Sequence, residues 1–241
     1  MNPPAEKQDS GLMRAMFHTV APCYDFITRA FSYGMDRRWK QTGVARASLP
    51  QRPSVLDLAC GTGDFSLLVQ QNYPGAQTVA VDLTERMLHL GRERGVSTAV
   101  CGDAGLLPFR SESFDCVCIG YGLRNFPNLE QALGEILRVM RPGGVLVSLD
   151  FFLPPNQLLR QLYLGYLYAQ GAFWGFLLHG RPRIYTYIPD SLRTFLSIED
   201  FTALLDHSGF RALDVRRHIL GGIGLHWAKK DAGRSVSARR Q

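Results

Sequence analysis

The sequence has few of the residues that build metal centres or disulfide frameworks. It contains five cysteines without any Cys-x-x-Cys pair, and its six histidines are scattered without the spacing of metal ligands. We therefore expect no bound metal, and reduced thiols in a cytoplasmic protein. Long hydrophobic runs are scarce too. Two glutamines, three tyrosines and three glycines dilute the uncharged stretch 161–178, so we do not expect it to span a membrane.

The composition is that of a soluble globular protein. The chain has 241 residues, 46% hydrophobic and 20% charged, which is enough for one good core and leaves little room for a second domain. Part of the net charge of +6 lies near the C-terminus, at Lys229, Lys230, Arg234, Arg239 and Arg240. Such a tail is either simply solvated or attracted to an anionic membrane surface.

A glycine-rich loop follows the first predicted strand. Residues 55–66 read VLDLACGTGDFS, an apolar run that ends at Gly61 and Gly63 with Thr62 between them. Glycines at the start of a helix allow the backbone to approach a ligand closely. The dinucleotide fingerprint requires a third glycine where this chain has Ser66, which counts against NAD or FAD. The alternative is an S-adenosylmethionine site built on Asp57 and the two glycines.

Three later strand ends carry residues suited to the same ligand. Asp82 ends the predicted strand 78–82, where a carboxylate can accept hydrogen bonds from ribose hydroxyls. Asp103 and Ala104 follow the strand 97–101, at the place of the adenine amino group in S-adenosylmethionine enzymes. Gly120 ends the strand 113–120. Because the carboxyl ends of parallel strands share one edge of a sheet, these residues should meet in one crevice.

Strands and helices alternate at about twenty-five residues per unit, which predicts right-handed βαβ crossovers and a parallel sheet. A closing hairpin, residues 211–219 and 223–229, completes a seven-stranded, Rossmann-like α/β sheet that is mostly parallel with an antiparallel final strand. The predicted segments are a disordered lead-in (1–10), a helical flap (11–45), the cofactor-binding core (46–152), a helical aromatic lid (153–196), the C-terminal part of the core (197–230) and a basic tail (231–241).

Several longer motifs make the interpretation more specific. They are Tyr24-Asp25 with Ser32-x-Gly34-x-x-x-Arg38-Trp39-Lys40, Gly122-Leu123-Arg124-Asn125, Arg138-Val139-Met140-Arg141-Pro142-Gly143-Gly144, and Tyr185-x-Tyr187-Ile188-Pro189-x-Ser191. With them, the chain resembles the ubiquinone/menaquinone biosynthesis C-methyltransferases of the UbiE/MenG type over nearly its whole length. One departure is Leu149-Asp150-Phe151-Phe152, where the family commonly has Leu-Glu-Phe-Ser. The departure leaves the quinone acceptor open.

The resemblance implies S-adenosylmethionine-dependent C-methylation of a prenylated quinol ring, from demethylmenaquinol to menaquinol, in ubiquinone biosynthesis, or in both. It implies that Arg124 stabilises the developing phenolate, while Asn125 and Tyr24 orient the ring or a water that takes its proton. A polyprenyl tail favours peripheral association with a membrane surface, with the aromatic lid touching lipid or forming an ordinary buried helix. Oligomeric state is open.

Other interpretations share the same cofactor loops. The chain could be another small-molecule methyltransferase that acts on nitrogen, oxygen or carbon of a hydrophobic acceptor, or a non-catalytic subunit that binds cofactor or quinone. Arg124 could be part of a helix-entry turn, paired to an acid. Nucleic acid is not an expected partner, because the fourth strand is not followed by the Asn/Asp-Pro-Pro-aromatic motif that holds a flipped base.

Overall fold

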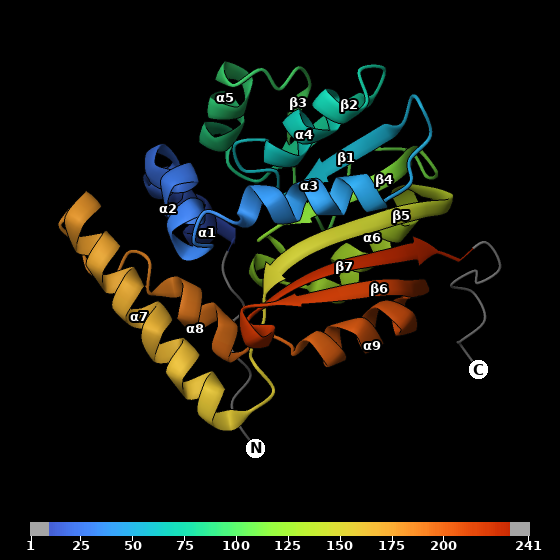
Figure 1. Ribbon diagram of the computed structural model, residues 1–241. Coiled ribbons are helices and arrows are strands. Elements are labelled where there is room, and N and C mark those ends of the chain that lie inside the picture. Colours follow the sequence, from blue (N-terminus) through green and yellow to red (C-terminus); the bar gives the residue numbers. More distant parts are fainter. Residues whose placement is uncertain (1–9, 232–241) are drawn as a thin grey trace.

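The computed structural model describes residues 10–231; nearly all of the predicted lead-in and basic tail, residues 1–9 and 232–241, lies outside the described residues. One seven-stranded sheet, in the order β3-β2-β1-β4-β5-β7-β6, runs through the described part (Figure 1). The strands are β1 (Ser54–Leu58), β2 (Gln77–Asp82), β3 (Ala99–Cys101), β4 (Phe114–Gly120), β5 (Met140–Phe151), β6 (Phe210–His218) and β7 (Ile223–Lys230).

Strands β1 to β5 pair in parallel, whereas β7 runs antiparallel to both β5 and β6. The predicted seven-stranded sheet with an antiparallel final strand is therefore confirmed. The chain order reverses at β1, which has β2 on one side and β4 on the other. In an open α/β sheet, such a reversal places a ligand crevice at the carboxyl ends of the two central strands.

Strand β5 begins earlier than the sequence predicts. A Pro-Gly-Gly segment such as residues 142–144 predicts the end of a helix, with the strand beginning at Val145. In the structure β5 starts at Met140, which pairs with Phe114. Gly143 has φ +78, and the register shifts between Phe114 and Cys116. The glycines thus form an irregularity inside the strand instead of a loop before it.

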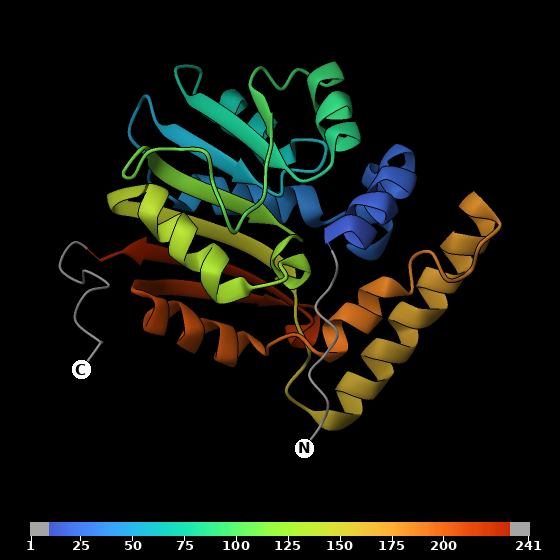
Figure 2. The ribbon, with the colours of Figure 1, turned by 180° about the vertical axis from the view of Figure 1, so that it is seen from behind.

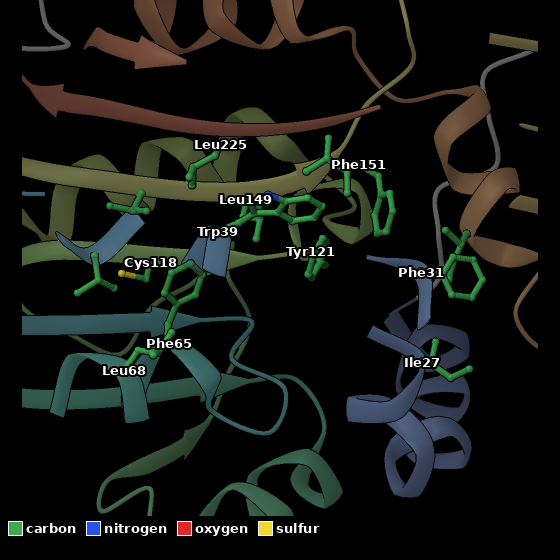
Figure 3. Close-up of a cluster of buried hydrophobic side chains, with 14 of the residues drawn as sticks. Ile27, Phe31, Trp39, Phe65, Leu68, Cys118, Tyr121, Leu149, Phe151 and Leu225 are labelled. Atoms are coloured by element: carbon green, nitrogen blue, oxygen red, sulfur yellow. The ribbon is translucent and has the colours of Figure 1, made fainter. Parts of the chain in front are cut away.

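Helices cover both faces of the sheet (Figures 1 and 2). On one face lie α3 (Asp36–Arg46), α4 (Asp64–Asn72) and α5 (Glu85–Glu93); on the other lie α6 (Leu129–Val139) and α9 (Ile198–Ser208). Successive side chains of a strand point to opposite faces, so each face has its own apolar cluster. The first, centred on Trp39, Phe65 and Cys118, is drawn in Figure 3.

The predicted flap separates into two structural parts. Helices α1 (Ser10–Val20) and α2 (Tyr24–Phe31), joined by the short helix η1 (Ala21–Cys23), gather beyond the carboxyl ends of the strands (Figure 1). Helix α3 packs on the sheet instead, since Trp227 Nε1 of β7 donates a hydrogen bond to the carbonyl of Gly43 at 2.9 Å. Only α1 and α2 are therefore placed to cover a ligand.

The predicted lid consists of α7 (Gln157–His179) and α8 (Tyr187–Arg193), which project beside α1 and α2 (Figures 1 and 2). The chain returns along α7 very closely: a Cβ on Gly175 would lie 2.6 Å from the carbonyl oxygen of Arg181. One side of α7 is thereby occupied by its own return segment. Within residues 10–231, no helix combines the length and apolar character needed to cross a membrane.

Candidate active site

The loop between β1 and α4 needs its two glycines for different reasons. Both have left-handed backbones, with φ +54 at Gly61 and +85 at Gly63. A Cβ on Gly61 would lie 3.0 Å from a ring carbon of Tyr24, whereas a Cβ on Gly63 would lie 2.3 Å from Val96. Gly61 therefore allows the α2 tyrosine to approach the loop, and Gly63 allows α4 to pack against the segment after α5.

Asp57 lies behind this loop and not in the cavity. Its carboxylate is buried and accepts hydrogen bonds from the backbone N–H and the hydroxyl of Ser66, both at 2.8 Å. Burial raises the pKa of Asp57 to about 7, although these two hydrogen bonds favour the charged form. Asp57 thus anchors the first turn of α4 and shapes the loop from behind.

A cavity of about 720 Å³, open mouth included, lies at the carboxyl ends of the central strands. Its floor comes from strand ends and its cover from α1 and α2. The lining residues are Met13, Phe17, Tyr24, Leu58, Ala59, Gly61, Val81, Asp82, Leu83, Thr84, Met87, Gly102, Asp103, Ala104, Gly120, Tyr121, Gly122, Asn125, Phe126 and Pro127. This is a mostly apolar pocket with a small number of polar groups, as small-molecule sites usually are.

Two carboxylates hold fixed positions in the cavity wall. Asp82 accepts the backbone N–H groups of Gly61 and Thr84, one on each oxygen and both at 2.9 Å. Burial raises the pKa of Asp82, and these hydrogen bonds oppose the rise. Asp103 accepts the N–H of Gly105 at 2.8 Å and is exposed. A carboxylate has about four acceptor positions, so both retain capacity for ligand hydroxyl or amino groups.

Among the described residues, three buried side-chain atoms of the cavity lining have no hydrogen-bond partner. They are the hydroxyl of Thr84 and, in the loop after β4, the hydroxyl of Tyr121 and Oδ1 of Asn125; Nε of Arg124, outside the lining, also has none. Tyr121 has φ +60, an unusual backbone for a tyrosine, while the Asn125 amide donates to the carbonyl of Tyr121 at 3.3 Å. A buried polar atom without a partner is costly, so the three atoms of the lining are suited to meet polar groups of a ligand.

Burial also determines the charge state of the phenols that line the cavity. It raises the pKa of Tyr24 and of Tyr121 well above the ordinary value of 10. For Tyr24 the positive charge of Arg124 acts in the opposite direction, so the field of this guanidinium reaches the cavity wall. Both phenols are therefore neutral near pH 7 and can act as hydrogen-bond donors, not as bases.

Arg124 does not line the cavity. Its side chain is buried, and its guanidinium donates to Oδ1 of Asp150 at 2.7 Å and to the carbonyl of Tyr121 at 2.9 Å. Asp150 is fully buried and also accepts the backbone N–H of Leu123 at 2.8 Å. The alternative interpretation of the sequence, a helix-entry turn in which Arg124 is paired to an acid, predicts such an arrangement. The role of Arg124 in stabilising a developing phenolate stays a prediction.

Comparisons with known proteins agree with this architecture. The profile of the ubiE/COQ5 methyltransferase family matches residues 5–230. The chain belongs to the ubiE/COQ5 methyltransferase family. A demethylmenaquinone methyltransferase of Thermus thermophilus is 38% identical over 218 residues, which cover 88% of this chain and 98% of that protein. The ubiquinone/menaquinone biosynthesis C-methyltransferase UbiE of Geobacter sulfurreducens is 35% identical over 226 residues, which cover 90% of this chain and 88% of that protein.

Similarity to solved structures extends the fold assignment to distant proteins. One chain of the Haloferax volcanii complex between the Trm112 methyltransferase activator and a methyltransferase matches with a TM-score of 0.65 and 15% identity. The match covers 89% of this chain and 97% of that chain. At this identity the comparison supports the methyltransferase fold alone, because one fold serves many reactions.

The residues predicted for this family member divide into those that line the cavity and those that lie behind it. The cavity lining includes Tyr24, Asn125, Gly61, Asp82, Asp103, Ala104 and Gly120. Asp57, Thr62, Gly63 and Arg124 lie outside that lining. Their contacts shape the loops that carry the first group, and the role of each residue stays a prediction.

Sequence reasoning missed two features of this site. Tyr121 was not selected, because nothing in its residue type signals a left-handed backbone at the strand end. The second is a polar network between α2 and the glycine loop: the Thr62 hydroxyl donates to Asp25 at 2.5 Å and accepts from Arg94 at 2.5 Å. Arg94 also pairs with Asp25 at 3.2 Å and with Asp64 at 2.7 Å. Only Tyr24-Asp25 had appeared among the motifs, without this role.

Proposed function

We propose that the protein transfers a methyl group from S-adenosylmethionine to a ring carbon of a prenylated hydroquinone, in menaquinone or ubiquinone biosynthesis. Family membership and the names of the relatives support the reaction type. The observation that carries the proposal is the apolar cavity in which three buried polar atoms lack partners among the described residues, the Tyr121 hydroxyl and Asn125 Oδ1 among them. A hydroquinone has an apolar ring and hydroxyl groups, which fit such a pocket.

The cavity also has features that suit the proposed donor. Gly61 offers a bare backbone at the floor, Asp82 has a fixed carboxylate for ribose hydroxyls, and Asp103 with Ala104 can receive adenine. Asp57, Thr62 and Gly63 hold the loop in shape. S-adenosylmethionine supplies an electrophilic methyl group on a sulfonium, and Gly120 lines the cavity where β4 ends, near the expected reaction centre.

The chain's own residues then have to activate and orient the ring. At a pKa near that of tyrosine, ionising the hydroxyl at pH 7 costs about 4 kcal/mol, so stabilising the phenolate is worthwhile. Asn125 accepts a hydrogen bond from the ring hydroxyl, or from a water that takes its proton. Tyr24 and Tyr121 donate hydrogen bonds to the oxygen as its charge grows. Arg124 holds the loop that carries Tyr121 and adds a positive field from behind.

Methylation assays with both ring types test this function. The protein is incubated with labelled S-adenosylmethionine and, in parallel, a demethylmenaquinol and a polyprenyl benzoquinol, and the product position is determined by mass spectrometry and NMR. A methyl on a ring carbon is the expected result. A methyl on oxygen or nitrogen, or no transfer to either ring despite donor binding measured by calorimetry, would refute the proposal.

Site variants separate binding from turnover. Tyr121→Phe and Asn125→Ala should each lower kcat by about a hundredfold, because each removes a group aimed at developing charge, while donor affinity stays near the wild-type value. Tyr168→Phe is the matched control. The hydroxyl of this lid tyrosine donates a hydrogen bond to Asp190 outside the cavity, so the variant should retain wild-type turnover. Normal turnover in Tyr121→Phe would remove that residue from the mechanism.

We also propose that the protein works in the cytoplasm at a membrane surface, since a polyprenyl tail resides in lipid. Burying two isoprene units would contribute several kcal/mol at about 0.8 kcal/mol for each CH₂, so the protein need not enclose the whole tail. Co-sedimentation of the protein with lipid vesicles tests this association. Protein that stays wholly in the supernatant would contradict it.

A further inference from the structure

The outward side of α7 is an exposed apolar face. Large side chains recur there at helical spacing with 58% to 67% of their surface exposed: Leu158, Leu162, Phe173, Phe176 and Leu177. The residues between them on this side, Gly165 and Ala169, are small and exposed. We call these seven residues the α7 face. In Figures 1 and 2, α7 lies at the edge of the molecule, away from the sheet.

Aromatic contacts connect the α7 face to α2. Phe173 packs edge-on against Trp174, and Trp174 against Phe26 of α2, both with ring centroids 4.9 Å apart. Phe26 is 46% exposed and lies two residues after Tyr24, which lines the cavity. The apolar surface is therefore continuous with the helix that covers the cavity, and it is larger than an isolated exposed side chain.

Charge distinguishes between the partners that such a face could meet. Residues 161–178 contain no charged side chain, whereas Arg181 and Arg183 follow the C-terminal end of α7. Both arginines are exposed, and neither forms an ion pair with another residue of 10–231. Arg29 and Arg37 instead line a second cavity together with Asp25, Asp36 and Asp64. An apolar strip with unpaired arginines beyond one end complements acyl chains and anionic lipid headgroups.

We infer that the α7 face, with Phe26, is the surface that lies in the headgroup layer of an anionic bilayer, with Arg181 and Arg183 reaching the phosphates from beyond the C-terminal end of the helix. The inference rests on the proposed function, because a polyprenyl acceptor would bring the protein to lipid. Helix α7 lies in the plane of the membrane, since its opposite side packs on its own return segment. Docking through this face places α2, and with it the cover of the cavity, next to the lipid that holds the acceptor.

Vesicle binding by matched variants tests the surface. Sedimentation is measured with phosphatidylcholine vesicles, with and without phosphatidylglycerol. Phe176→Gln should weaken binding by about tenfold, because it removes a large ring from the apolar layer. Leu213→Gln, which changes a 49% exposed residue on β6, should bind as the wild type does. Arg181→Gln with Arg183→Gln should weaken binding several-fold on anionic vesicles only.

Each alternative outcome is distinct. If the wild type does not bind either kind of vesicle, or if Phe176→Gln and Leu213→Gln behave alike, the assignment of the surface is overturned. A dimer in sedimentation velocity that Phe176→Gln converts to monomers, with vesicle binding unchanged, would identify the face as a contact between copies. Methylation of a short-tailed acceptor without vesicles is measured in parallel. Its absence in the wild type would reject the proposed function while leaving the vesicle result valid.

Discussion

Replacing Asp150 by asparagine should destabilise the fold strongly although the two side chains have nearly the same shape. One oxygen of Asp150 accepts from Arg124 and from the N–H of Phe151, and the other accepts from the N–H of Leu123. An asparagine would turn one of these oxygens into an N–H donor that faces another donor. It would also leave the charge of Arg124 buried without a counter-charge.

The expected loss follows from this burial. Breaking a buried ion pair by removing one partner costs about 3 to 5 kcal/mol, against a typical total stability of about 5 to 15 kcal/mol. For a chain of this size, such a loss lowers the melting temperature by roughly 10 °C. Urea denaturation followed by circular dichroism gives the free energy of unfolding directly, and thermal denaturation gives the second measure.

A double-mutant cycle separates the pair from its surroundings. Arg124→Leu should cost a similar amount, because it leaves the Asp150 carboxylate buried and unpaired. The double variant Arg124→Leu/Asp150→Asn should cost less than the sum of the two, by about 2 kcal/mol, since both charges are gone. Arg217→Gln is the control: it breaks an exposed pair with Glu199 and should cost less than about 1 kcal/mol. The reasoning would be refuted if the two effects on the free energy of unfolding were additive. It would also be refuted if Asp150→Asn lowered that free energy less than Arg217→Gln does.

Three further predictions concern the glycine loop and one buried histidine. Gly61→Ala should weaken S-adenosylmethionine binding about tenfold in calorimetry. Residue 61 has a left-handed backbone that disfavours alanine, and the added Cβ would press on the ring of Tyr24. Unchanged affinity would contradict this. Arg94→Gln should raise the dissociation constant of the donor several-fold but not the KM of the acceptor, because it breaks the hydrogen bonds to Thr62. A change in the KM of the acceptor alone would contradict this expectation. Burial lowers the pKa of His226 from 6.5 to about 4, so the wild type loses stability as pH falls between these values. His226→Phe should therefore gain stability relative to the wild type over that range in urea denaturation, and a pH-independent difference would show that His226 does not titrate as described.

The arrangement of the strand ends could be predicted because it follows from topology. Right-handed crossovers bring the carboxyl ends of parallel strands to one edge, so Asp82 and Asp103 reach the same cavity whatever their individual contacts. The start of β5 could not be predicted. A Pro-Gly-Gly segment usually marks a turn, but here the left-handed Gly143 lets the strand continue and pair with Phe114.

The direction of individual side chains was the second limit. The sequence places Asp57 on a strand that ends at the ligand loop, but only the packing of α4 shows that its carboxylate points to Ser66. Arg124 and Asp150 are 26 residues apart, and no local pattern indicates that the two side chains meet. Whether a charged residue near a crevice contacts the ligand or a structural partner depends on such distant pairing.

This pairing changes how kinetic effects at Arg124 must be interpreted. The carbonyl of Tyr121 accepts hydrogen bonds from both Arg124 and Asn125, so the arginine fixes the loop in which two proposed catalytic side chains lie. Loss of turnover in Arg124→Ala would therefore not identify it as a group that contacts the substrate. If Arg124 acts only through position, the loss in kcat should parallel the loss found for Asp150→Asn, which leaves the arginine charge in place but disturbs the same turn. If the positive field itself stabilises the phenolate, Arg124→Ala should additionally shift the pH dependence of kcat to higher pH, and Asp150→Asn should not.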